Sequence, residues 1–142
     1  KIIEFNQDEI DELDSQQVRK VIVCSGKVFY DLLQTRRERA IKDIAIIRLE
    51  QLYPFPHDEY RETLKRYSNV EEVVWCQEEP RNQGAWYSSQ HHFFRGVDDA
   101  YNGLILGYAG REASAAAAAG YAALHLRQQK EFIDDALTIC KF

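Results

Sequence analysis

The sequence contains no methionine and only three cysteines. These two features limit the kinds of site that the chain can form and bear on whether it is part of a longer polypeptide. Cys24, Cys76 and Cys140 are odd in number and far apart, and the absence of any Cys-x-x-Cys motif excludes the common zinc-site and redox-pair patterns. Cys24 and Cys76 lie within apolar runs, so we expect buried, inert thiols in a reducing compartment. Because an initiator methionine is missing, we expect a piece of a longer polypeptide or a processed chain.

Positive charge is also scarce. The 142 residues include 18 Lys and Arg against 23 Asp and Glu, which gives a net charge of −5. A nucleic-acid-binding domain usually presents a basic face, so this balance argues against nucleic acid as a partner. No apolar run approaches the length of a membrane helix, and the N-terminus does not read as a signal peptide, so we expect no membrane partner.

Catalytic and metal-binding patterns are missing as well. The sequence has no P-loop, no Gly-x-Gly-x-x-Gly and no Gly-x-Ser-x-Gly. Glu78 and Glu79 are adjacent in an extended segment, where side chains point in opposite directions, so they do not converge on one bond. His91 and His92 diverge by about 100° on a helix, and His57 stands alone, so structural histidines are the default interpretation. We expect no catalytic residue and no metal site in this chain.

What the sequence does contain is an alternation of strands and helices. Apolar, β-branched runs predict strands at 18–24, 43–49, 73–79 and 103–109, and three- to four-residue spacing predicts helices at 27–40, 57–67, 85–94 and 121–137. We expect Ser25 to cap the first helix, a loop at 95–102 and a turn at 110–114. The alternation predicts an α/β fold, a mainly parallel sheet with helices on both faces. Residues 1–17 are predicted to be a linker arm and residues 18–142 the domain.

One stretch, residues 73–86, organises the expected site. It begins as a buried strand and ends in Glu78, Glu79 and Pro80, where two carboxylates must reach the surface and proline stops the strand. In open α/β sheets, ligands dock at the carboxyl ends of the strands. We therefore expect Glu78 and Glu79 at a polar crevice, one ordering the crevice and the other meeting a partner surface.

Several basic residues are candidates for binding an anion. The turn at 25–27 follows a strand and opens a helix, so its backbone N–H groups and Lys27 suit a phosphate or carboxylate. Arg36, Arg37 and Arg39 form a small basic patch, and Arg111 is a candidate second element. The alternative is an ordinary strand–helix turn and a solvated helix end, which the residues alone favour.

Four segments resemble one family. CSGKVFYDL (24–32), AIIRLEQLYPFP (45–56), WCQEEPRNQGAW (75–86) and YAGREAS (108–114) are similar to the C-terminal, transketolase C-terminal-like domain of the 2-oxoglutarate dehydrogenase decarboxylase component. The resemblance runs from about Val18 to Leu137, with the motifs in the order of that family.

The resemblance implies a three-layer α/β/α domain whose mostly parallel, mixed sheet contains one antiparallel strand. It implies a full-length homodimeric enzyme of the tricarboxylic acid cycle, which uses thiamine diphosphate and Mg²⁺ to decarboxylate 2-oxoglutarate and succinylates the lipoyl group of a succinyltransferase partner. The resemblance implies that upstream domains hold those cofactors through a Gly-Asp-Gly…Asn motif, and this chain has no Gly-Asp-Gly. The isolated domain is expected to bind none of them and to brace the dimer.

The resemblance also implies effector and interface residues. Some relatives bind acetyl-CoA in this domain, and the matching positions for acetyl-CoA or a nucleotide effector are Lys27, Arg36, Arg37, Gln77, Arg111 and Ser114. The crevice or interface positions are Glu78, Glu79, Asn82, Gln83 and Trp86. The run 115–119 departs from the pattern of the family.

Two further hypotheses stay open at this stage. One is the corresponding domain of a 2-oxoadipate dehydrogenase, which this domain hardly distinguishes from the 2-oxoglutarate enzyme. The other is a free-standing CoA- or nucleotide-binding module without catalysis, against which the missing initiator and the acidic entry arm argue. If the chain is a domain of 2-oxoglutarate dehydrogenase, we expect it in the cytoplasm of a bacterium or in the mitochondrial matrix of a eukaryote.

Overall fold

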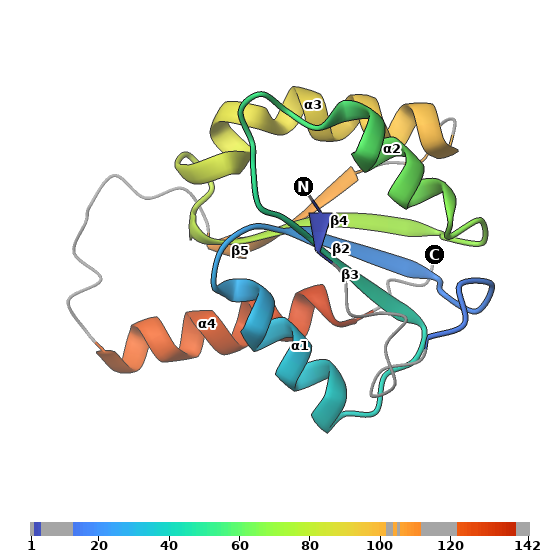
Figure 1. Cartoon of the computed structure of the whole chain (residues 1–142). Coiled ribbons are helices and arrows are strands. Elements are labelled where there is room, and N and C mark those ends of the chain that lie inside the picture. Colours follow the sequence, from blue (N-terminus) through green and yellow to red (C-terminus); the bar gives the residue numbers. More distant parts are fainter. Residues whose placement is uncertain (1, 4–12, 102–103, 105, 112–121, 139–142) are drawn as a thin grey trace.

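The computed structural model describes residues 2–3, 13–101, 104, 106–111 and 122–138, with only the backbone for 2–3 and 122–126 (Figure 1). In these ranges strands and helices alternate as the sequence predicts. In chain order they are β1 (Ile2–Ile3), β2 (Lys20–Cys24), α1 (Val28–Glu38), β3 (Ile44–Leu49), α2 (His57–Lys65), β4 (Glu72–Pro80), α3 (Gly84–Tyr101), β5 (Leu106–Arg111) and α4 (Ala122–Ala136).

The five strands form one sheet in the order β1-β3-β2-β4-β5. β2 pairs in parallel with β3 and β4, and β4 pairs in parallel with β5. β1 lies antiparallel on the outer side of β3, with Ile2 opposite Leu49. The predicted mostly parallel, mixed sheet with one antiparallel strand is therefore confirmed.

Helices cover both faces of the sheet, which gives the expected three layers (Figure 1). α2 and α3 lie on one face, and α1 and α4 lie on the other. Successive strand residues point to opposite faces, so Val21 and Val23 join the core under α2 and α3, whereas Ile22 and Cys24 join the core under α1 and α4. The central strands are buried on both sides, which is why their sequences are continuous β-branched runs.

α3 is longer than predicted, and the loop expected at 95–102 is wrong up to Tyr101. The helix continues through Gly96, a residue that lowers helix propensity. Gly96 is required here by packing, since a Cβ at this position would lie 2.2 Å from a ring atom of Tyr60 on α2. Gly96 is therefore the close-contact point between the two helices.

Three other local expectations change. Ser25 does not cap α1, because the N-cap residue is Lys27 and no side chain caps it. The turn expected at 110–114 is wrong for Gly110 and Arg111, which belong to β5, and residues 112–114 lie outside the described residues. Residues 1–17 contribute to the domain where they are described, because Ile2 and Ile3 pair with β3 and Leu13 is buried in the core. The boundary at 17/18 stays a prediction.

In the described ranges, no helix combines the length and apolarity that a bilayer crossing needs.

Candidate functional site

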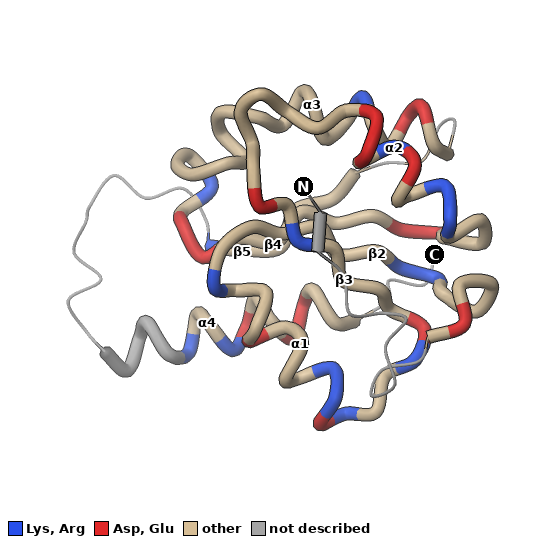
Figure 2. The backbone as a smooth tube through the Cα atoms, viewed as in Figure 1, with Lys and Arg blue, Asp and Glu red and all other residues tan. Residues whose placement is uncertain are grey.

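The carboxyl ends of the parallel strands bring charged side chains together at one edge of the sheet. Lys27 follows β2, Glu78 lies near the end of β4, and Arg111 ends β5. Gln129 reaches this edge from α4, and Asp31 reaches it from the first turn of α1. We call these five residues the edge network, and Figure 2 shows charges of both signs gathered where these strands end.

Glu78 is at the centre of the edge network. Its Oε1 accepts a hydrogen bond from Gln129 Nε2 at 3.1 Å, and its Oε2 lies 3.8 Å from Lys27 Nζ. Gln129 Nε2 also donates to Asp31 Oδ2 at 3.1 Å. Arg111 donates from Nη1 to the Glu78 carbonyl at 3.3 Å and from Nη2 to Gln129 Oε1 at 2.9 Å. The network thus joins β4, β5, α1 and α4.

The two cations of the edge network differ in accessibility. The Arg111 guanidinium is held by Glu78 and Gln129 and also lies 5.6 Å from the centre of the Phe132 ring. The Lys27 side chain is 84% exposed, whereas that of Glu78 is 22% exposed. An exposed ion pair at 3.8 Å contributes little to stability, so Lys27 can exchange its partner for a ligand at small cost.

Gln77 has a different role from the one expected. It is 2% exposed, and its side-chain amide is engaged on both atoms. Oε1 accepts from Trp75 Nε1 and from the Trp86 backbone N–H, both at 2.9 Å. Nε2 donates to the carbonyls of Glu79, Pro80 and Gln83 at 2.9–3.1 Å. Gln77 therefore fastens the turn between β4 and α3, and its amide is directed into that turn instead of the crevice.

The two adjacent glutamates point in opposite directions, as the sequence predicts. Glu78 faces the edge network. Glu79 lies against the α3 side, where its side-chain atoms come within 3.1–3.2 Å of the place a Cβ would occupy on Gly84. Gly84 has a φ of +68°, so its conformation and its surroundings both favour glycine.

The remaining interface candidates are divided between surface and core. Asn82 and Gln83 are exposed in the turn, whereas Trp86 is 6% exposed and belongs to the core. Arg81 covers this area, with its guanidinium 4.9 Å from the centre of the Tyr108 ring and 6.0 Å from that of Trp86. Trp86 is therefore a core residue beneath the turn between β4 and α3.

The anion-site candidates do not form one cluster. Arg36 and Arg37 lie at the end of α1 away from Lys27, more than two helical turns along the axis. Arg36 is 1% exposed and donates to the Ile44 carbonyl at 3.2 Å, at the start of β3. Arg37 is exposed at that opposite edge. Ser114 falls outside the described residues.

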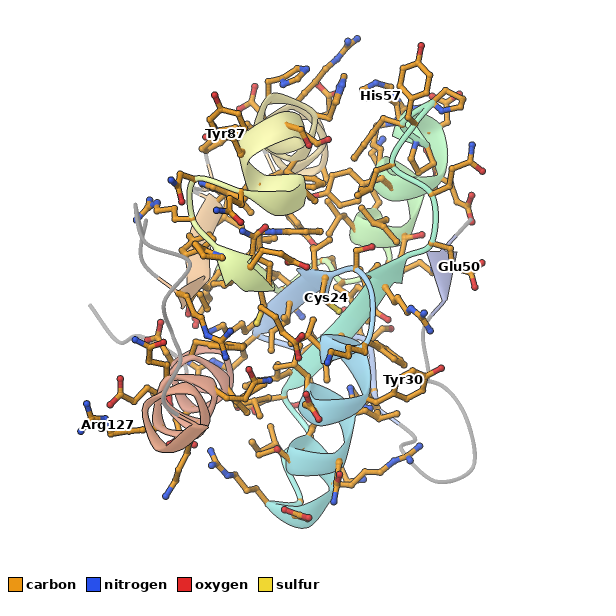
Figure 3. All side chains as sticks on the ribbon, turned by 90° about the vertical axis from the view of Figure 1, so that its left-hand side faces the viewer. Cys24, Tyr30, Glu50, His57, Tyr87 and Arg127 are labelled. Atoms are coloured by element: carbon orange, nitrogen blue, oxygen red, sulfur yellow. The ribbon has the colours of Figure 1, made fainter. Side chains whose placement is uncertain are left out.

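The two described cysteines are free and buried, as predicted. They lie side by side on β2 and β4, with Cys24 in register with Cys76, and Figure 3 places Cys24 in the interior of the molecule. Burial is the main cause that raises the pKa of both thiols. A thiolate is therefore disfavoured at either position, and neither is suited to act as a nucleophile.

His57 does not stand alone, so that expectation is wrong. Its ring lies 4.7 Å from that of His92, and His91 lies 3.9 Å from His92. Phe55 stacks on His92 at 4.9 Å and 18°. Burial lowers the pKa of His92, and the nearby His91, His57 and Arg95 lower it further. The sequence does not reveal this group, because His57 lies 34 and 35 positions from His91 and His92 and on another helix.

The described residues contain no group of three or more His, Cys, Asp and Glu side chains placed to hold a metal ion. Two surface hollows flank α4. One, of about 330 Å³, is lined by Arg111, Glu131, Phe132 and Asp135 among others. The other, of about 360 Å³, lies between α1 and α4. Both are open to solvent, so neither resembles an enclosed ligand cavity.

Comparison with known proteins identifies the family. The sequence profile described as "2-oxoglutarate dehydrogenase C-terminal" matches residues 2–137. The chain belongs to this family. The 2-oxoglutarate dehydrogenase E1 component of Haemophilus influenzae is 55% identical over 130 residues, and that of Azotobacter vinelandii is 54% identical over 131 residues. The predicted resemblance is confirmed.

The matches cover nearly the whole of this chain but only a small part of each relative. Each covers 92% of this chain and 14% of the relative, so the chain spans about one seventh of their length. A solved structure titled "Split gene transketolase, inactive beta4 tetramer" superposes with a TM-score of 0.57 at 16% identity, covering 89% of this chain and 41% of that one. At this identity the likeness shows the fold alone, and it confirms the transketolase C-terminal-like architecture.

Proposed function

We propose that this chain is the C-terminal domain of a 2-oxoglutarate dehydrogenase E1 subunit and that its own role is structural and regulatory. The observation that carries the proposal is the match of nearly the whole chain, at 53–55% identity, to about one seventh of three such E1 components. The polar side chains at the sheet edge support the same role, because they fasten strands and helices to one another.

The proposal assigns the whole enzyme the activity that its relatives are named for. The full-length subunit would form a homodimer, decarboxylate 2-oxoglutarate with thiamine diphosphate and Mg²⁺, and pass the succinyl group to the lipoyl group of a succinyltransferase. The names of the relatives favour 2-oxoglutarate over 2-oxoadipate, and their bacterial sources favour the cytoplasm.

The described residues do not fit a thiamine diphosphate–magnesium site themselves. The described part of the chain has no group of three or more His, Cys, Asp and Glu side chains placed to hold a metal ion, and the sequence has no Gly-Asp-Gly. The two carboxylates of the edge network, Asp31 and Glu78, both accept hydrogen bonds from Gln129.

A domain exchange tests the assignment. The corresponding C-terminal segment of the Azotobacter vinelandii E1 component is replaced by this chain, and oxidation of 2-oxoglutarate is measured in the reconstituted complex. We expect the chimaera to be dimeric and to oxidise 2-oxoglutarate at a rate close to that of the unmodified enzyme. A folded, dimeric chimaera without turnover would contradict the assignment.

A free-standing module is the second candidate, and the size of the native polypeptide distinguishes it. An antibody against this segment should detect a band several times larger than the 16.6 kDa of this chain in the source cell. A native band near 16.6 kDa would instead support a CoA- or nucleotide-binding module.

We also propose that Lys27 provides the accessible cation for an anionic effector such as acetyl-CoA or a nucleotide, with Arg111 behind it. Support comes from the 84% exposure of Lys27 and its weak pairing with Glu78. In the full-length enzyme, Lys27→Gln should weaken activation by acetyl-CoA or a nucleotide several-fold while leaving the basal rate unchanged. Arg37→Gln, at the opposite edge, is the matched control. Equal activation in both variants would remove Lys27 from the effector site.

A further inference from the structure

The joint between α2 and α3 contains three of the four histidines of the chain. His57 is the first residue of α2, and His91 and His92 lie in the middle of α3. Figure 3 shows His57 at the outer end of its helix, on the same side of the molecule as Tyr87 of α3. The ring distances of 3.9 Å and 4.7 Å place the imidazoles in direct contact, with His92 in the centre.

Phe55 connects this group to the core. Its ring stacks on His92, lies 4.9 Å from His57, and also contacts Tyr60 and Phe93 at 5.6 Å and 5.5 Å. Phe55 belongs to the connection 50–56 between β3 and α2, which also carries Tyr53 at 92% exposure. The histidine group therefore holds this connection and the start of α2 against α3.

The charges around the group do not compensate additional protons. Arg95 on α3 is the charged neighbour that acts on His92, and it is a cation. Asp58 on α2 follows His57, but its carboxylate is paired with Arg61 at 3.2 Å. The ring of Phe55 can accommodate one proton on His92 through a cation–π contact. A second or third proton would meet a like charge in a touching ring.

We infer that His57, His91 and His92 form a proton-sensitive joint that locks α2 and the connection 50–56 onto α3 when neutral and loosens them when charged. The direction of the pH effect follows from the difference in proton binding between the closed and the open joint. Released histidines titrate near pH 6.5, whereas His92 in the joint resists protonation, so the open form binds more protons as the pH falls. The joint is fully stable above about pH 6.5 and weakens below it.

Other contacts make the opening local. Deeper in the same helix pair, the Tyr60 hydroxyl donates to the Phe93 carbonyl at 3.3 Å, and the Tyr101 hydroxyl donates to the Leu64 carbonyl at 2.6 Å. Burial raises the pKa of both tyrosines, so these bonds do not titrate in the same range. Protonation should therefore loosen the histidine end of the pair first.

Hydrogen–deuterium exchange of the full-length native polypeptide at pH 7.5 and pH 5.5 tests the inference. Rates are corrected for intrinsic exchange, and peptides from β4 serve as the internal reference. We expect protection of α2 to fall several-fold more than that of β4 at pH 5.5, because each unit of lowered histidine pKa changes the opening equilibrium by at most about tenfold.

Variants decide whether the histidines are responsible. His92→Gln and His91→Gln should each reduce the extra loss at pH 5.5, and the exposed His91 keeps the test valid if His92→Gln fails to fold. His125→Gln, in α4 on the other face of the sheet, is the matched control and should keep the full loss. The inference is overturned if α2 shows no extra loss in the unmodified protein, or if the folded His91 and His92 variants retain all of it.

Discussion

Gln77→Ala is the substitution that most directly tests how the candidate site is built. The change removes one buried amide and leaves the apolar core in place. Two buried donors, Trp75 Nε1 and the Trp86 backbone N–H, lose their acceptor. The carbonyls of Glu79, Pro80 and Gln83 lose their donor, but they lie in a turn that water can reach.

The expected magnitude follows from these contacts. A buried donor left without an acceptor costs about 1–3 kcal/mol, so the two donors together give about 2–6 kcal/mol. Hydration of the carbonyls offsets part of the remainder, and we expect the free energy of unfolding to fall by about 3–5 kcal/mol. A domain of this kind is stable by only about 5–15 kcal/mol, so a large part of the total is at stake.

Urea unfolding followed by tryptophan fluorescence measures this change, since both tryptophans of the chain are partners of Gln77. Gln34→Ala, at an exposed position on α1, is the control and should change stability by less than about 0.5 kcal/mol. A loss below about 1 kcal/mol for Gln77→Ala, with an unchanged m-value, would refute the reasoning.

Gln77→Glu tests the acceptor role of the Gln77 side chain separately from its donor role. The variant keeps an acceptor for Trp75 and Trp86 but loses the donor to the turn and buries a carboxylate. Burial should raise the pKa of that carboxyl above its unfolded value, so the folded state binds the proton more tightly. The penalty relative to the unmodified protein should therefore shrink as the pH falls towards 4. A penalty independent of pH would show that the side chain has left the site.

Three further predictions concern the core. Gly96→Ala should destabilise the domain by about 2–3 kcal/mol in urea unfolding, because its Cβ would overlap the Tyr60 ring, whereas the same change in an exposed helix adds up to about 1 kcal/mol. Lys20→Met should cost about 1–3 kcal/mol by the same assay and increase hydrogen exchange at the end of α4, since the Lys20 ammonium donates to two carbonyls there; unchanged exchange would contradict this role. Cys24 and Cys76 should resist a thiol reagent at pH 8 until the domain unfolds, because burial raises both pKa values, and rapid labelling of the native protein would contradict their burial.

Local patterns predicted much of the fold. β2, β3 and the first half of β4 contain apolar runs because these segments are buried on both faces, so the strand positions are readable to within one or two residues. The opposite orientation of Glu78 and Glu79 follows from the two-residue period of a strand and is also confirmed.

The site was less predictable because its contacts are long-range. Gln129 is 51 positions from Glu78, and His57 is 35 positions from His92. Arg36 resembled a solvated helix end in the sequence, yet its guanidinium reaches the Ile44 carbonyl and is buried. Residue type and spacing do not reveal such partners, because each depends on how the helices pack on the sheet.

The sequence by itself therefore determined the class of fold, the order of its strands and helices and the family to which the chain belongs, since these depend on local periodicity and on motifs that are continuous along the chain. Only the tertiary structure decided the roles of individual polar residues. It made Gln77 a fastener of the β4–α3 turn, separated Lys27 from Arg36, and assembled three histidines between two helices. The physical reason is that burial and hydrogen-bond partners, which set the role of a polar side chain, arise from packing between distant segments.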